Sequence, residues 1–287
     1  MKKSTYVSVL VLLIFILSTI AALTWIFSND GTDPFIFKTI LWENIEIYGK
    51  GIYKHMSTDV AIQWIAQDYV TLFVWAPLLL ISLYLYRRNN LKWKILLLWT
   101  LFYFFLTYLF YTAMAMYNSI FLVYVSLLCF SFFALFTIFP EISNKDIENI
   151  YECKIIVKYI SAFLIINCIM IAILWLNVIL PPLFDWTIYP ESLQHYTTLI
   201  VQGFDLWLFL PIGFVSSIMA LNKNRYWFVF VSAYIVFLSI LMLALVSKII
   251  FMANSWANVV PVIFIISVIF TISLILTSLL FMKMKEN

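Results

Sequence analysis

Long apolar runs separated by short polar patches recur along the whole chain. Crossing about 30 Å of hydrocarbon takes roughly 20 helical residues. Runs of this length predict eight transmembrane helices, near residues 5–27, 67–86, 95–116, 119–139, 156–180, 198–221, 226–252 and 257–281. We therefore expect an all-α fold, a polytopic membrane helix bundle, in which residues 1–287 form a single integral membrane domain.

Two apolar runs are too long to be single helices. The run from Ile95 to Phe139 carries no charge and would be about 68 Å long as one helix, roughly twice the bilayer core. It must fold back, and its turn is predicted at Tyr117, Asn118 and Ser119. The run from Tyr226 to Phe281 poses the same problem. Its turn is predicted among Asn254, Ser255, Asn258 and Pro261.

The first run follows Lys2 and Lys3, as the hydrophobic part of a signal peptide would. It is longer than the usual apolar region of such a peptide, about 7 to 15 residues. This length favours a retained helix.

Two longer polar segments, 28–66 and 181–197, are predicted as outer loops. In the first, alternating residues around Gly49-Lys50-Gly51 predict a small β-hairpin at 44–54. An amphipathic helix is expected next, from about Ser57 to Ala66, with Ser57 as its N-cap. The Gly-Lys-Gly triplet is not a phosphate loop, because the required glycine spacing and following Ser or Thr are missing.

Composition supports a membrane protein. The chain is 65% hydrophobic and 11% charged, with a mean hydropathy of +1.03, values outside the range of soluble globular domains. The net charge of +3 comes from basic residues at the ends of apolar runs, so no nucleic-acid partner is expected. The three cysteines show no CxxC or Cys/His spacing, and neither a disulfide framework, a metal site nor a cofactor is predicted.

The basic residues also predict the orientation. Eight crossings place both termini on one side, and positively charged residues gather on the cytoplasmic side of membrane proteins. Four basic residues fall on or near the other face, namely Lys38, Lys50, Lys54 and Lys248. The remaining 13 of the 17 lie on the face of the termini. We expect a multi-pass plasma membrane protein, embedded in the lipid bilayer, with cytoplasmic termini.

Asp205 is the first candidate for chemistry, because it lies inside an apolar run. A carboxylate at a helix centre costs about 2.5 to 3.5 kcal/mol to insert, so it should be paired, protonated or in contact with water. Lys248 lies at a similar expected depth and is a candidate ion-pair partner. Such a pair could equally be a buried salt bridge without activity, or Lys248 could extend outward to the interface.

Further polar residues could line the same pocket. Gln202 precedes Asp205 by three residues and shares its helical face. Gln63, Gln67 and Asp68 lie at the start of the second predicted helix, although Asp68 could also be an ordinary acid at a helix start. Pro77 and Pro211 are expected to kink their helices.

The only histidines, His55 and His195, are expected in the outer loops, as candidate ligand-binding residues or as solvated side chains. No HExxH motif or i,i+4 histidine pair indicates a metal site. No GxSxG motif and no pair of glutamates within a span indicates a catalytic site, so no catalytic residue is predicted.

An internal echo links two of these regions. "HMSTDVAIQWIAQDYVTLFVWAP" and "HYTTLIVQGFDLWLFLP" both contain His, a hydroxyl cluster, Gln, Asp and then Pro. They begin the second and sixth predicted helices, which are equivalent in a four-plus-four repeat of the kind found in transporters. The Asp-to-Pro spacing is nine residues in one and six in the other, so coincidence is the alternative.

Four segments carry a resemblance: "IYGKGIYKH", "AQDYVTLFVWAPLLL", "YNSIFLVYVSL" and "HYTTLIVQGFDLWLFLP". Together they resemble a group of uncharacterised bacterial polytopic membrane proteins with a YGxGxY loop, a Gln-Asp pair at a helix start and a Tyr-Asn hairpin. The resemblance covers nearly the whole chain and implies one integral domain in a bacterial membrane. It implies no activity, and Lys248 lies outside its motifs.

Three functions remain open at this stage. The first is binding or transport of a small solute or ion through an outward-facing polar pocket, with Asp205 as the recognising charge. The second is a non-catalytic sensor or assembly partner that binds through its outer loops to a protein or cell-envelope component. The third is an intramembrane enzyme that modifies lipid, which the missing catalytic motifs disfavour.

Overall fold

The computed structural model describes residues 3–39, 42–142, 144–187, 189–254, 260 and 262–284. Within them, eight helical segments are long and apolar enough to cross a membrane. Their bounds are Thr5–Phe27, Thr58–Tyr86, Leu91–Met114, Phe121–Glu141, Lys154–Phe184, Ile200–Leu221, Arg225–Ala253 and Val262–Lys283. The predicted helical class is confirmed, and eight helices match the eight predicted spans.

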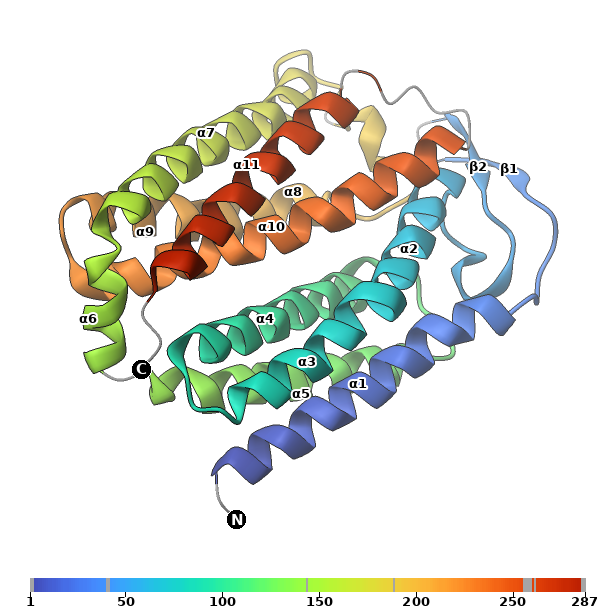
Figure 1. Ribbon diagram of the computed structural model, residues 1–287. Helices are drawn as coiled ribbons and strands as arrows, with labels where there is room; N and C mark the ends of the chain where they lie inside the picture. Colours follow the sequence, from blue (N-terminus) through green and yellow to red (C-terminus); the bar gives the residue numbers. More distant parts are fainter. Residues whose placement is uncertain are drawn as a thin grey trace.

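The chain folds as a helical bundle with a small two-stranded sheet at one end (Figure 1). Its elements are α1 (Lys3–Phe27), β1 (Phe35–Lys38), β2 (Asn44–Ile47), α2 (Thr58–Val70), α3 (Ala76–Tyr86), α4 (Leu91–Met114), α5 (Phe121–Ile138), α6 (Asn144–Glu152), α7 (Lys154–Phe184), α8 (Ile200–Phe204), α9 (Leu210–Leu221), α10 (Arg225–Asn254) and α11 (Val262–Lys283). Single π-helical turns join α2 to α3, at Thr71–Trp75, and α8 to α9, at Asp205–Phe209.

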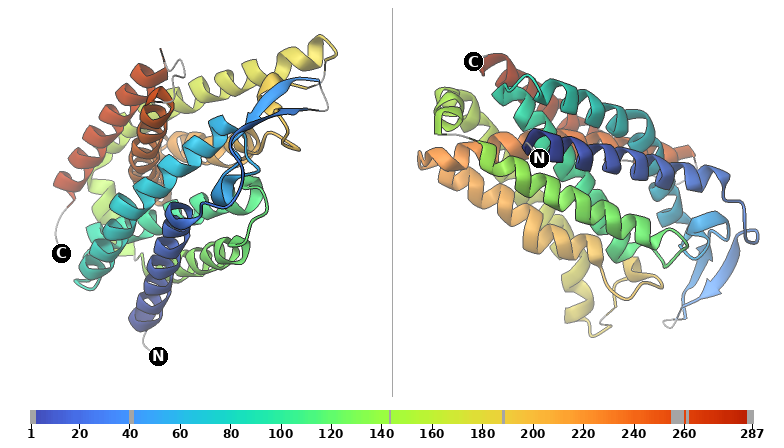
Figure 2. Two further views of the ribbon diagram at one scale, coloured as in Figure 1. Left: turned by 90° about the vertical axis from the view of Figure 1, so that its right-hand side faces the viewer. Right: turned by 90° about the horizontal axis from the view of Figure 1, so that it is seen from below.

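Helix α10 is the centre of the bundle. It contacts α2, α4, α6, α7, α9 and α11, and most of its length is buried. Helices α7 and α11 lie at the periphery, and most of their side chains face outward. Figure 2 shows the same arrangement from two further directions.

The two halves of the chain repeat one pattern of helix contacts. In the first half, α1 packs on α3, α3 on α4, α4 on α5, and α5 back on α1. In the second half, α7 packs on α9, α9 on α10, α10 on α11, and α11 back on α7. This correspondence supports the four-plus-four repeat, which stays a prediction because contacts alone do not establish superposition.

Both predicted turns between long apolar runs separate two helices. Helix α4 ends at Met114 and α5 begins at Phe121, so the predicted Tyr117-Asn118-Ser119 turn is confirmed. Helix α10 ends at Asn254 and α11 begins at Val262. Three of the residues expected to form this second turn, Ser255, Asn258 and Pro261, lie outside the described residues.

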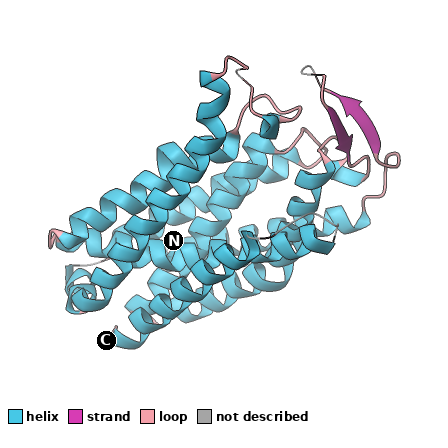
Figure 3. Ribbon diagram, turned by 90° about the horizontal axis from the view of Figure 1, so that it is seen from above, coloured by secondary structure: helices cyan, strands magenta, loops and turns pink. Residues whose placement is uncertain are grey.

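The β-hairpin predicted at 44–54 was wrong in its pairing. Strand β2 pairs along its length with β1 before it, with Phe35 opposite Ile47. After the glycines, only Ser57 pairs with it, in an isolated bridge to Ile47. Gly49 and Gly51 have φ values of +79° and +60°, in the left-handed region that favours glycine. These turns direct the chain into a 3₁₀ helix at Gly51–Tyr53 that enters the bundle, which leaves no second strand there. Figure 3 shows the hairpin among the loops at one end of the bundle.

The second span begins at Thr58, nine residues before the predicted start near 67. The helix expected from about Ser57 is present, and it continues without interruption into the span. Ser57 occupies the N-cap position, but its side chain makes no capping hydrogen bond. The predicted boundary was wrong because Thr58, Asp59 and Gln63 lower the hydropathy of the first helical turns, which were therefore assigned to the loop. Gln67 and Asp68, expected at the entrance of the span, are buried inside the bundle.

Candidate functional site

A carboxylate buried among tyrosines is the main polar feature of the bundle. Asp68, on α2, is 5% exposed. Its Oδ2 accepts a hydrogen bond from the hydroxyl of Tyr53 at 2.5 Å, and its Oδ1 accepts one from the hydroxyl of Tyr111 at 2.8 Å. Tyr111 belongs to α4, whereas Tyr53 comes from the loop that follows the β-hairpin. One carboxylate therefore joins the loop to the interior of the bundle.

The loop backbone brings Tyr53 to this position. Left-handed glycines on either side of Lys50 turn the chain inward, and the hydroxyl of Ser28 accepts a hydrogen bond from the backbone N–H of Ile52 at 2.9 Å. Tyr53 is then fully buried. Burial, with the Asp68 carboxylate nearby, holds the pKa of Tyr53 well above its usual value. Its hydroxyl therefore remains a hydrogen-bond donor across the physiological pH range.

More aromatic side chains enclose the pair. Tyr108 and Tyr124 are buried and interact electrostatically with Asp68. The Trp64 ring lies 4.0 Å from that of Tyr111, centroid to centroid. One helical position before Asp68, Gln67 donates a hydrogen bond to the hydroxyl of Tyr103. We call Tyr53, Trp64, Gln67, Asp68, Tyr103, Tyr108, Tyr111 and Tyr124 the Asp68 cluster.

Lys248 interacts electrostatically with Asp68 and not with Asp205. Its charge acts on Asp68 from α10, at a separation beyond direct ion-pair contact. The predicted pair of Lys248 with Asp205 is absent from the structure, which describes both residues. The reason is the packing of α10 directly against α2, which turns Lys248 toward the first half of the chain.

Asp205 has a different environment. Its Oδ2 accepts a hydrogen bond from the indole N–H of Trp175 on α7 at 2.7 Å. Cys168 on α7 and Tyr234 on α10 interact with it electrostatically. Gln202, predicted to share a pocket with Asp205, is half-buried on the preceding turn, where its backbone carbonyl accepts the Asp205 N–H. A common pocket for Asp68 and Asp205 is therefore not supported.

The two prolines expected to kink their helices each follow a π-helical turn. Each five-residue turn ends two residues before the proline, at Trp75 before Pro77 and at Phe209 before Pro211. Proline has no N–H to donate and its ring collides with the preceding turn, so a wider turn relieves the clash. The backbone N–H of Ala76 accordingly bonds to the carbonyl of Thr71, five residues back.

The two histidines lie together at the loop end of the bundle. The Nε2 atom of His195 is 2.9 Å from the backbone carbonyl oxygen of His55, and the His195 ring makes an edge contact with Phe37 of β1. The interaction joins the two loop segments that precede α2 and α8 through a backbone atom. Among the described residues, no group of three or more His, Cys, Asp and Glu side chains is arranged to hold a metal ion.

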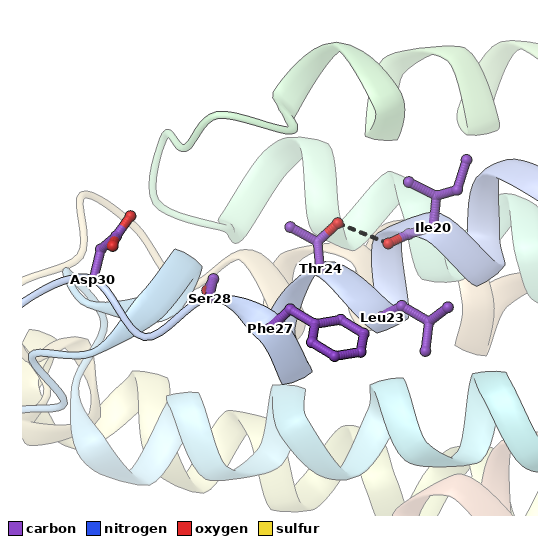
Figure 4. A pocket seen from close by; sticks show the side chains of 6 residues that line it. All are labelled: Ile20, Leu23, Thr24, Phe27, Ser28 and Asp30. Atoms are coloured by element: carbon purple, nitrogen blue, oxygen red, sulfur yellow. Dashed lines mark hydrogen bonds between the residues drawn. The ribbon is translucent and has the colours of Figure 1, made fainter.

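The site is closed in this conformation. A crevice between α1 and α2 reaches Asp68, with Ala22, Trp25, Ile26, Tyr69 and Leu72 as its other lining residues, and it has no room for a water molecule. An open groove of about 510 Å³ lies along the end of α1, lined by Ile20, Leu23, Thr24, Phe27, Ser28 and Asp30 (Figure 4). Asp68 does not line it, so the predicted outward-facing pocket is not open at the cluster.

Sequence reasoning missed the tyrosines. Tyr53, Tyr111 and Tyr124 are separated along the chain, and aromatic residues are common in every apolar run. One local signal was present, a tyrosine two residues after a Gly-Lys-Gly triplet in a polar loop. Gln63 is half-buried on α2, and a ligand-binding role for it, as for the other polar candidates, stays a prediction.

Comparisons of the chain with family models, with curated proteins and with solved structures find no match.

Proposed function

We propose that this chain is an integral plasma membrane protein with both termini in the cytoplasm. Eight apolar helices of sufficient length support insertion. The start of α1 and the end of α11 lie away from the β-hairpin, at the other end of the bundle (Figure 1). The excess of Lys and Arg at that end favours the cytoplasm there. A reporter fused after Lys50 that reads out as cytoplasmic would contradict this orientation.

Within that frame, the proposed function is binding or transport of a small solute or ion, with Asp68 in place of Asp205 as the recognising charge. The observation that carries the proposal is the buried Asp68 carboxylate, which receives one hydroxyl from an outer loop and one from the core. Charged groups within membrane helices are costly and typically mark ligand or ion pathways.

The hydrogen-bond pattern indicates the class of ligand. Tyr53 and Tyr111 both donate to Asp68, so a ligand that replaces Tyr53 must also supply a donor. Ammonium groups meet this requirement, and the faces of Trp64 and the surrounding tyrosines attract cations. Lys248 provides a countercharge to Asp68. We therefore propose a small solute with a cationic or hydroxyl donor group, admitted when Tyr53 moves out with its loop.

A thermal-shift screen tests this proposal directly. Purified protein in detergent would be heated with amino acids, polyamines, sugars, polyols and monovalent cations in turn. At least one donor-bearing solute is expected to raise the unfolding temperature of the wild type, because a ligand that binds only the folded state stabilises it by mass action. Asp68→Asn should remove this shift, because it replaces the charge with an amide of nearly the same shape.

The matched control is Asp205→Asn, which makes the same change on α8–α9, outside the Asp68 cluster. It should keep the ligand-induced shift. A shift that survives Asp68→Asn, or that is lost equally in both variants, would refute the assignment of the site. The absence of any shift in the wild type across the whole screen would count against the binding function itself.

A second candidate function has its own observation. The β-hairpin exposes Phe35, Ile36, Phe37 and Trp42, with the Lys38 ammonium over the Trp42 ring. Exposed apolar patches of this kind mark interaction surfaces. If the protein is a sensor or assembly partner, serine substitutions at Ile36 and Trp42 should abolish its function and reproduce the phenotype of a gene deletion. Asp68→Asn should then be tolerated, the reverse of the result expected for solute binding.

A further inference from the structure

Asp205 is a membrane-depth carboxylate with a single neutral hydrogen-bond donor. Its position six residues into the span Ile200–Leu221 places it about 8 Å from the start of that helix. The donor is the indole N–H of Trp175. The structure describes Asp205 and records no ion pair for it, so no lysine or arginine of the described chain neutralises it at contact distance.

The neighbouring titratable groups do not supply a positive charge. Helix α7 contributes the thiol of Cys168 and α10 contributes the phenol of Tyr234, and both are neutral or negative when they titrate. The Tyr234 hydroxyl already donates to the backbone carbonyl of Phe209 at 3.0 Å. Both side chains also pack so closely on Gly213 that a Cβ there would lie within 3 Å of each. This wall of the site is therefore fixed and contains no cation.

An unneutralised carboxylate in such surroundings has two stable options, contact with water or protonation. Asp205 is half-buried, and the large exposed side chains nearest to it on this helix, Trp207 in the same π-helical turn and Ile212 in the following turn, are apolar. In a bilayer this surface borders lipid and not bulk water. Asp68 differs from Asp205 in its exposure and in its countercharge. It is deeply buried, and Lys248 supplies a positive charge that acts on it.

We propose that Asp205 is a proton-binding site of the second half of the chain, separate from the solute site at Asp68. The carboxyl group holds a proton in its apolar surroundings, and Trp175 donates to the carboxylate when the proton leaves. The inference rests on the proposed membrane insertion and is independent of solute binding at Asp68. In a transporter, such a group would be suited to carry the coupling proton.

Reaction with a hydrophobic carbodiimide tests the proposal on the full-length protein in membranes. Dicyclohexylcarbodiimide reacts with a protonated carboxyl group. The acid proton moves to one nitrogen, the carboxylate oxygen bonds to the central carbon, and the adduct rearranges to a stable N-acylurea without loss of atoms. Mass spectrometry of the digested protein should find one carbodiimide on Asp205 and none on Asp68, because the crevice to Asp68 excludes even water.

The controls distinguish a protonated Asp205 in apolar surroundings from an ionised Asp205 in contact with water. A water-soluble carbodiimide should label exposed loop carboxylates and leave Asp205 unmodified, and Asp205→Asn should lose the hydrophobic label. The label should decrease about tenfold per pH unit once Asp205 ionises. In Trp175→Phe, it should persist to more alkaline pH, because the donor that stabilises the carboxylate is gone. A merely structural tryptophan would not move this pH profile.

Two results would overturn the proposal. One is the absence of hydrophobic label on Asp205 between pH 5 and 8, and the other is equal labelling by the water-soluble reagent. Carbonate extraction of the same membranes tests insertion separately, because an inserted protein stays with the membrane pellet. A failure at Asp205 in a protein that resists extraction would thus refute the proton site and leave the membrane assignment standing.

Discussion

Replacing Tyr53 by phenylalanine removes one hydroxyl from the Asp68 cluster and changes no apolar contact. The lost interaction is a 2.5 Å hydrogen bond to a buried carboxylate, whose remaining donor is Tyr111. Hydrogen bonds to charged groups contribute about 1.5–3 kcal/mol in soluble proteins. Between membrane helices the average is lower, about 0.6 kcal/mol with a maximum near 1.7. Because this carboxyl group is 5% exposed and the two hydroxyls are its hydrogen-bond donors, we expect a loss of about 1–2 kcal/mol in the free energy of unfolding.

Equilibrium unfolding in mixed micelles of a mild and a denaturing detergent would measure this loss. A double-mutant cycle with Asp68→Asn isolates the pairwise interaction, and a coupling energy of at least about 0.5 kcal/mol is expected. The control is Tyr117→Phe, the same chemical change at a tyrosine that is 80% exposed, which should leave stability unchanged. Strictly additive effects of Tyr53→Phe and Asp68→Asn would refute the assignment of this hydrogen bond as an energetic link between loop and core.

Three further predictions concern backbone, packing and thiol chemistry. Gly51→Ala should destabilise the protein by about 1–3 kcal/mol, because φ is +60° and the new Cβ would lie 2.5 Å from the Ser28 carbonyl oxygen; an unchanged unfolding temperature would contradict this. Gly213→Val should lower the unfolding temperature more than Gly213→Ala, because Tyr234 must yield more space to the larger side chain; equal effects would speak against the tight packing. Burial, aided by a nearby glutamate, raises the pKa of the Cys153 thiol, so its thiolate is scarce near pH 8. Iodoacetamide should therefore alkylate Cys153 more slowly in the folded than in the unfolded protein at that pH. Equal rates would contradict the burial of this thiol and its raised pKa.

The sequence predicted the helices well because their signal is local. A run of about 20 apolar residues is long enough to cross a bilayer wherever its neighbours lie, and a run of twice that length must contain a turn. Prediction failed where a polar residue was buried. Asp68 reads as the polar start of a helix, yet it lies well inside α2 because three tyrosines and Lys248 provide partners that no local pattern reveals.

The candidate site was predicted only in part for the same reason. The sequence identified Asp68, Asp205 and Lys248 as charges within predicted spans, and all three lie in the described part of the chain. It paired Lys248 with Asp205 because both were expected at a similar depth. Depth fixes only one of three coordinates, however, and the direction of each side chain depends on which helices pack together. The packing of α10 on α2 decided the partner.

The paired π-helical turns bear on the history of the molecule. A π-helical turn differs from an α-helical one by a single extra residue, so it can arise from one inserted codon. The second span of each half contains such a turn, and each ends two residues before its proline. If the halves descend from a gene duplication, one insertion made before the duplication accounts for both turns. The carboxylates then changed position afterwards, since Asp68 lies three residues before its turn and Asp205 begins its own. On this view the backbone irregularity is ancestral, and the different charge environments of the two halves are the later acquisition.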